Sequence, residues 1–177
     1  DASLPAAKTI KIRDAGAQRA ADPDGRVRVC GWVHRVRKQG KHMMFATVRD
    51  GTGFLQVLFG REMCACAAFQ RIVAESSVSL FGKLVPVPAG KSAPGGHELV
   101  VDYWEIVGLA PSGDDAFETR LNKEAGADVL LDQRHLVLRG ETAAGVMRAR
   151  SALLQAFRAH YAAEGYVEVT PPCMTQT

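Results

Sequence analysis

The sequence of 177 residues contains few cysteines and no long apolar run, and these absences exclude several classes of protein. Its four cysteines, Cys30, Cys64, Cys66 and Cys173, are too few and too scattered for a disulfide framework, and reduced cytoplasmic thiols explain them. No stretch of about 18 apolar residues is present to span a bilayer. The N-terminal residues mix acids and bases without the apolar centre of a secretory signal. We therefore expect a cytoplasmic protein without a membrane segment.

Recognisable metal and phosphate-binding patterns are also missing. Cys64 and Cys66 lie two positions apart in a predicted helix, which turns their side chains about 200° apart. No histidine or second cysteine pair follows at zinc spacing, so both cysteines are predicted to be small buried apolar side chains. No loop of the form GxxxxGK[ST] occurs, and the GDD at Gly113 is an isolated acidic turn. We expect no metal site in these residues.

What the sequence does contain is an uneven distribution of charge. The net charge is only +3, yet residues 26–49 hold seven basic residues and two histidines with no acid. Residues 109–133, in contrast, hold six acids against Arg120 and Lys123. A basic segment in a nearly neutral chain predicts one face that binds a polyanion. The alternative is a solvated strand edge whose charges prevent aggregation, and charge alone does not separate the two.

Residues 26–108 are typical of a small β-barrel, with short strands separated by turn signals. Alternation predicts that Val27, Val29 and Val33 share one face of the first strand, and that Phe54 and Gln56 share one face of the third. A helix is expected at residues 61–75, and the five strands are expected at residues 26–36, 43–50, 54–60, 76–87 and 97–108. Three strands, a helix and two strands is the order of an OB-fold, whose second and third strands commonly hold single-stranded nucleic acid. A five-stranded barrel without that function stays open.

The fold class is therefore mainly β, with a helical part at the C-terminal side. We expect an N-terminal extension (1–25), the barrel (26–108), an acidic linker (109–133) with at most one helical turn, and a second unit (134–177). In that unit Thr142 is a plausible N-cap for a helix over residues 143–164 that ends at Gly165. One apolar stripe runs along this helix, and residues 166–170 are predicted to form a strand. The stripe consists of Val146, Ala149, Leu153, Phe157 and Tyr161.

Two stretches resemble a known family. GWVHRVRKQGKHMMFATVRDGTGFLQVLF (31–59) closely resembles the anticodon-binding OB-domain of aspartyl-, asparaginyl- and lysyl-tRNA synthetases. LDQRHLVLRGE (131–141) and the helix leading into EGYVEVTPPCMTQT (164–177) resemble the start of a class II synthetase catalytic domain, including its motif 1. RHLVLRG and VTPP are more similar to the asparaginyl than to the aspartyl enzymes.

This resemblance implies roles for individual barrel residues. Phe45 matches the aromatic residue that stacks on the central uridine of the anticodon, and Gln56 matches its hydrogen-bonding partner. An amide suits uridine because it offers both a donor and an acceptor. Arg37 and Gln39 match further contacts to the loop, and Glu98 is a candidate acceptor from a base amino group. Taken alone, Phe45 would be a core aromatic residue and Gln56 an exposed strand residue.

Other residues are expected to contact phosphates or a second subunit. Arg35, Lys38 and Lys41 are predicted to be phosphate contacts, and Trp32 is predicted to pack in the core. The motif 1 helix resembles the dimer interface of class II synthetases, with Pro172 near the partner's active site. Its alternative is an amphipathic helix packed on its own domain. The interface residues expected from the resemblance are Leu153, Phe157, Tyr161 and Pro172.

The resemblance implies an asparagine-tRNA ligase that uses ATP and Mg²⁺, binds an asparagine-specific tRNA and forms a homodimer. The arginines of motifs 2 and 3, which serve ATP, lie beyond the part that this chain resembles. We therefore expect a fragment of a longer enzyme, with no catalytic residue and no bound cofactor, and ATP–pyrophosphate exchange by these residues alone would refute this. The alternatives are an aspartyl-tRNA synthetase, a freestanding OB module that binds RNA, and an assembly fragment that dimerises without binding RNA.

Overall fold

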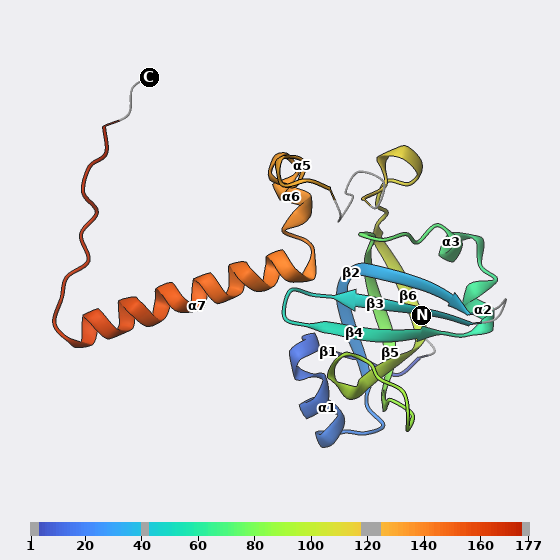
Figure 1. Ribbon diagram of the computed structural model, residues 1–177. Helices are drawn as coiled ribbons and strands as arrows, with labels where there is room; N and C mark the ends of the chain where they lie inside the picture. The colour runs from blue at the N-terminus through green and yellow to red at the C-terminus, as the bar shows by residue number, and fades with distance from the viewer. Residues whose placement is uncertain (1–3, 40–42, 118–124, 175–177) are drawn as a thin grey trace. The chain divides into compact units, whose positions relative to one another are not determined.

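A computed structural model describes residues 4–39, 43–117 and 125–174, and the chain divides into two compact units, 1–120 and 121–177 (Figure 1). The first unit is a barrel with a short additional strand. Its strands are β1 (Lys8–Thr9), β2 (Arg26–Gln39), β3 (Met43–Arg49), β4 (Phe54–Phe59), β5 (Ser77–Pro86) and β6 (His97–Gly108). Its helices are η1 (Ile12–Asp14), α1 (Ala15–Ala21), α2 (Arg61–Cys64), α3 (Ala67–Gln70), η2 (Pro94–Gly96) and η3 (Gly113–Asp115).

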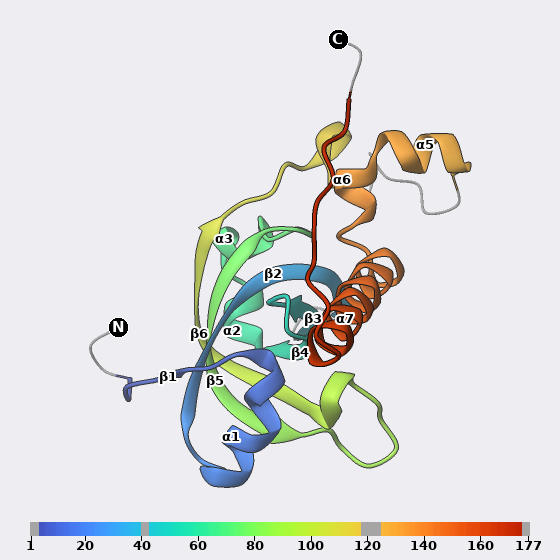
Figure 2. The same ribbon diagram turned by 90° about the vertical axis from the view of Figure 1, so that its left-hand side faces the viewer.

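The barrel closes because β2 is long enough to serve two neighbours. Its first half pairs antiparallel with β5, and its second half pairs antiparallel with β3. The remaining pairs are β3 with β4, β4 with β6 in parallel, and β6 with β5. Figure 2 shows β2 curving across the barrel between these partners. The predicted fold class is confirmed, because the order β2-β3-β4-β6-β5 with the extra pairing of β2 and β5 is a five-stranded OB-type barrel.

The core follows the predicted alternation. Val27, Val29 and Val33 on β2 are at most 2% exposed, as are Leu55 and Val57 on β4. Each such side chain contributes about 1.5–3 kcal/mol by leaving water. Residues between these positions point outward, which leaves the outer surface of the sheet free for polar chemistry.

The segment before the barrel is more ordered than the sequence indicates. β1 runs parallel to β2, with Lys8 opposite Val27. Ile12 and Ala15 are only 6% and 5% exposed and belong to the barrel core. The backbone N–H of Ile12 also donates to the Asp50 carboxylate at 2.8 Å. A strand of two residues has no periodicity to detect, so sequence analysis assigns no element before Arg26.

Three local predictions in the barrel unit are wrong. The single helix over residues 61–75 is two short helices, because Cys66 adopts an extended backbone (φ −75°, ψ 126°) between them. Cys66 is consequently exposed rather than buried, while Cys64 is half-buried against the core. Trp32 is 38% exposed instead of packed in the core, since the neighbouring Val33 takes the inward position on β2.

The second unit contains α5 (Ala127–Asp132), α6 (Arg134–Val137) and the long α7 (Glu141–Ala163). Gly165 follows α7 with φ +82°, as a C′ glycine should, which confirms the predicted helix end. Thr142 is not the N-cap, because the helix already begins at Glu141 after an extended Gly140. Residues 166–170 form no strand, since no strand in the described residues of this unit lies beside them to complete a ladder.

None of the helices in the described part of the chain is both long and apolar enough to cross a membrane.

Candidate nucleic-acid interface

The outer face of the barrel carries a row of polar side chains across four strands. Arg35 on β2 lies opposite Thr47 on β3, Thr47 lies opposite Gln56 on β4, and Gln56 lies opposite Glu98 on β6. Neighbouring strands are about 4.8 Å apart, so the row spans about 15 Å. We call these four residues the polar row.

A second row lies beside it, two residues further along each strand. It contains Arg37, Phe45, Leu58 and Val100, which are successive partners across the same strands. We call these four residues the aromatic row. Together the two rows place one aromatic ring and two apolar side chains directly next to polar and charged groups.

Phe45 belongs to this outer face and not to the core. Its neighbours Met44 and Ala46 are 5% and 3% exposed, whereas Phe45 itself is half-buried on the opposite side of β3. The guanidinium carbon of Arg37 lies 5.5 Å from the centre of the Phe45 ring, within the range of a cation–π contact. A flat ring held by a cation on the outer face of an OB-fold can act as a platform for an unstacked base.

Gln56 is oriented by Glu98. The Nε2 group of Gln56 donates a hydrogen bond of 2.9 Å to the Glu98 carboxylate, and Glu98 is only 7% exposed. An ionised carboxylate can only accept, so the NH₂ group of the amide must face Glu98. The amide then keeps its carbonyl oxygen and one N–H for a ligand. An adjacent donor and acceptor of this kind match the N3–H and carbonyl of a uracil edge.

A β-bulge brings the basic residues of β2 to the same face. The register of β2 with β3 shifts between Val33 and Arg35. Val36 therefore points inward and packs against the core, whereas Arg35, Arg37 and Gln39 are exposed. A strict alternation from Val33 would have turned Arg35 inward. The bulge thus sets two cations beside Phe45 and Gln56.

Two of the predicted phosphate contacts are not on this face. Lys38 is opposite Met44 and lines a separate cleft near Cys64, on the other side of β2 from Arg37. Lys41 lies outside the described residues. Of the predicted cations, the structure therefore brings Arg35 and Arg37 together with Phe45, Gln56 and Glu98, and separates Lys38 from them.

An aromatic group that sequence analysis missed borders the polar row. Trp32 and Phe54 flank Arg49 across β2, β3 and β4, and the His34 ring lies 5.1 Å from Phe54 in an edge-on geometry. Arg49 is committed to the fold, because it pairs with Glu75 at 2.6 Å and both side chains are nearly buried. An exposed tryptophan at this position has no sequence signal, since GW alone does not tell which way the ring points.

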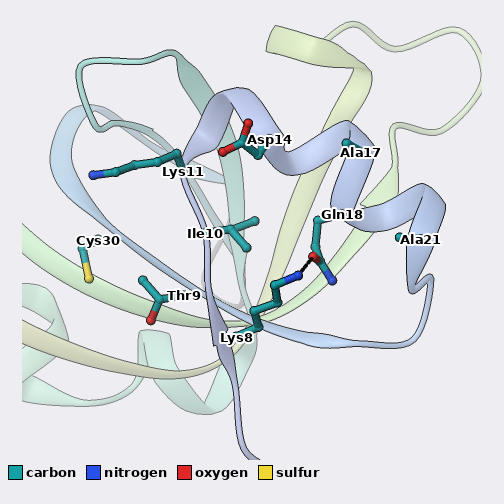
Figure 3. A pocket seen from close by; sticks show the side chains of 9 residues that line it. All are labelled: Lys8, Thr9, Ile10, Lys11, Asp14, Ala17, Gln18, Ala21 and Cys30. Carbon is teal, nitrogen blue, oxygen red and sulfur yellow. Dashed lines mark hydrogen bonds between the residues drawn. The ribbon is translucent and has the colours of Figure 1, made fainter.

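A shallow groove of about 520 Å³ lies elsewhere on the barrel unit, between β1, α1 and Cys30 of β2 (Figure 3). Lys8 reaches across it and donates to the Gln18 side chain at 2.7 Å, while Lys11 points away from both. The lysine–glutamine bond ties α1 to β1, so this groove reads as part of the N-terminal packing.

The predicted interface residues of the second unit are all exposed. Leu153, Phe157 and Tyr161 are 57%, 50% and 51% exposed and follow one another at steps of four along α7. Pro172 is exposed as well. No residue of α7 is buried within the described chain, so its apolar stripe is available to another surface.

Comparison with protein families divides the chain at nearly the same place as the two compact units. Residues 27–107 match the family described as OB-fold nucleic acid binding domain, and residues 126–177 match the family described as tRNA synthetases class II (D, K and N). The Phe45 face therefore belongs to the first family and α7 to the second.

Curated relatives resemble the chain over its whole length. The cytoplasmic asparagine–tRNA ligases of Debaryomyces hansenii and Homo sapiens are 51% and 46% identical to it. In both cases the alignment covers 100% of this chain and 31% of the relative, so the chain spans about a third of the length of the curated relatives it matches.

Solved structures agree with this. Asparaginyl-tRNA synthetase of Entamoeba histolytica in complex with asparaginyl-adenylate has a TM-score of 0.81 at 27% identity, over 96% of this chain and 38% of that one. The enzyme of Pyrococcus horikoshii, also complexed with asparaginyl-adenylate, has a TM-score of 0.73 at 27% identity, over 93% of this chain and 36% of that one.

Proposed function

Because the chain belongs to the asparagine-tRNA ligase family of class II synthetases, we propose that its barrel recognises the anticodon loop of an asparagine-specific tRNA. The observation that carries this proposal is the fixed amide of Gln56, held by Glu98 one strand row away from the Phe45 ring. A platform and a base-reading amide at neighbouring positions are what recognition of an unstacked base requires.

Each residue of the two rows then has a role. The central uridine stacks on Phe45, whose other contact is the Arg37 guanidinium. The free donor and acceptor of Gln56 read the uracil edge, and Glu98 both orients that amide and can accept from a neighbouring base. Arg35, Arg37 and Gln39 contact the loop, with Arg35 on its phosphates. Lys38 and Lys41 would meet phosphates only where the RNA passes the end of the β2–β3 hairpin.

For the whole ligase we propose ATP-dependent attachment of asparagine to its tRNA, with ATP and Mg²⁺ as cofactors. The asparaginyl-adenylate in the related structures supports the use of ATP. In the described part of this chain, no group of three or more His, Cys, Asp or Glu residues could hold a metal ion. We therefore assign binding of tRNA, and no chemical step, to these residues.

The proposed division of the chain is an N-terminal extension (1–25), an anticodon-binding barrel (26–108), a linker (109–133) and the beginning of a catalytic domain (134–177). We further propose a cytoplasmic location, in keeping with the names of the relatives, and a homodimer formed through α7. The exposed apolar stripe of α7 supports the dimer.

The proposal is tested by titrating the chain with an asparagine-tRNA anticodon stem-loop and with the same loop carrying cytidine in place of its central uridine. Both titrations are made at two salt concentrations, because phosphate contacts weaken with salt and base contacts do so much less. We expect tighter binding to the uridine loop at both concentrations. Equal binding of the two loops that disappears with salt would reduce the barrel to a basic surface.

A further inference from the structure

A cleft of about 210 Å³ opens at the end of the β2–β3 hairpin, beside the point where β4 gives way to α2. Figure 1 shows α2 at this end of the three strands. The cleft is lined from the hairpin by Lys38, Met43 and Met44, and from the α2–α3 segment by Cys64, Phe69, Gln70 and Ile72.

The floor of the cleft is apolar and fixed. Met44, Phe69 and Ile72 are 5%, 2% and 7% exposed. The Phe69 ring packs between Phe59, at 4.7 Å, and Trp104, at 5.3 Å, so it has little freedom to move. The cleft is thus a preformed feature of the barrel end.

The rim is polar and open. Lys38 and Gln70 are exposed, one on each side of the mouth. Within the part of the chain that the structure describes, neither head group is held in a hydrogen bond. A simple packing void would be closed and lined by apolar atoms, whereas this one presents an ammonium and an amide to whatever enters.

The cleft continues the aromatic row. Met43 lies on β3 two residues from Phe45, which separates them by about 7 Å along the strand. It is 41% exposed and lines the mouth of the cleft. Lys38 directly follows Arg37, the residue over the Phe45 ring. An extended strand that leaves Phe45 along the hairpin therefore reaches the cleft within one step.

We propose that this cleft receives a second nucleobase of the bound RNA, adjacent to the base that stacks on Phe45. The inference rests on the proposed function and adds a site to it. Methionine sulfur and the Phe69 edge form favourable contacts with a flat ring, and the Gln70 amide can bond to the edge of the base. Lys38 supplies the cation for its phosphate, which gives this residue a role although it faces away from Arg37.

Two cysteines provide the first test, because Cys64 lines the cleft and Cys66 is exposed outside it. Burial raises the pKa of the Cys64 thiol, so its alkylation by iodoacetamide is compared with and without RNA at one pH rather than with Cys66. A saturating asparagine-tRNA anticodon stem-loop should slow modification of Cys64 about tenfold, as a bound base would, and leave Cys66 unchanged. Unchanged alkylation of Cys64 under saturation overturns the inference.

A pair of matched variants provides the second test. Gln70→Trp fills the cleft from its exposed rim and should weaken binding of the stem-loop about tenfold. Ala68→Trp adds the same ring to the same helix at an exposed position that does not line the cleft, and should bind like the unchanged chain. Stem-loops with one base removed at a time should then identify one position, next to the central uridine, whose removal costs the unchanged chain affinity but not Gln70→Trp.

The two proposals fail differently. If the stem-loop binds, Phe45→Ala weakens it and Gln70→Trp does not, the cleft is only a hollow and the anticodon face stands. If no stem-loop binds at all, or Phe45→Ala has no effect, the anticodon face itself is wrong and the cleft inference falls with it.

Discussion

Phe45 shows how one residue can be moved from core to surface by its strand neighbours. Its ring is half-buried on the outer face, so truncation removes a platform without opening the core. We expect Phe45→Ala to lose about 1–3 kcal/mol of binding to the cognate stem-loop, which is the usual cost of one stacking contact. Phe45→Tyr keeps the ring and should retain most of the affinity. Titration with thermal unfolding as a control measures both, and an unaltered affinity of Phe45→Ala would contradict its role.

Gln56 and Glu98 act as a pair at the same scale. Gln56→Ala should reduce the preference for uridine over cytidine by about 0.5–1.5 kcal/mol, the net value of a hydrogen bond. Glu98→Gln keeps the shape but no longer forces the Gln56 NH₂ group toward it, so it should weaken the preference in the same direction. Competition between the two stem-loops measures this. An intact preference in Gln56→Ala would show that another residue reads the base.

At the scale of the strand, Gly31 determines how closely β2 and β3 approach. A Cβ atom there would lie 2.5 Å from the Arg49 carbonyl oxygen and 2.8 Å from a Val48 methyl group. The carbonyl belongs to the backbone of β3 and cannot move without disturbing the ladder, so Gly31→Ala should destabilise the barrel by about 1–3 kcal/mol. A Cβ atom at Gly60 meets nothing within 4 Å, and Gly60→Ala should change stability by less than about 0.5 kcal/mol. Urea unfolding of both variants tests the comparison.

The turn between β3 and β4 holds the N-terminal segment through Asp50. Burial alone would raise the pKa of this carboxyl, but hydrogen bonds from the Thr52 hydroxyl and from the N–H groups of Ile12, Thr52 and Gly53 lower it overall. A carboxyl whose pKa is lower in the folded than in the unfolded chain stabilises the fold above its unfolded pKa, and that stability is lost as the pH falls through the folded value.

Two results follow for Asp50→Asn. The variant should be less stable than the unchanged chain at pH 7, and its stability should fall less steeply below about pH 4, where the unfolded aspartate begins to bind protons. Urea midpoints at several pH values measure this, and parallel curves would contradict it. The amide of Ile12 should also exchange its hydrogen faster, because its acceptor is weakened.

For the whole molecule, the exposed stripe of α7 predicts self-association. Leu153 and Phe157 are each at least half exposed on one face of the helix, an arrangement that favours burial against a second copy. We expect the unchanged chain to show a concentration-dependent dimer in sedimentation, and Phe157→Glu to shift it toward monomer by placing a charge in the interface. Gln155→Glu makes a similar change on another side of α7 and serves as the control. A monomer at all concentrations would contradict the dimer.

The sequence by itself determined what depends on local pattern. The alternation of Leu55 and Val57 with Phe54 and Gln56 was enough to give the faces of β4, and the order of strands and helix predicted the OB-type barrel. The resemblance then pointed to Phe45 and Gln56 as a pair. These features were accessible because period-two alternation and turn residues act between near neighbours in the chain.

Only the tertiary structure decided the features that depend on distant partners. The bulge after Val33 turned Arg35 and Arg37 outward and sent Lys38 to the cleft, and the parallel pairing of β4 with β6 joined Gln56 to Glu98, 42 positions later. Docking of Ile12 on Asp50 and exposure of Trp32 were likewise invisible. Residues 166–170 have the composition of a strand but form none. In each case the outcome depends on which backbone groups meet across the fold, and no window of neighbouring residues records that.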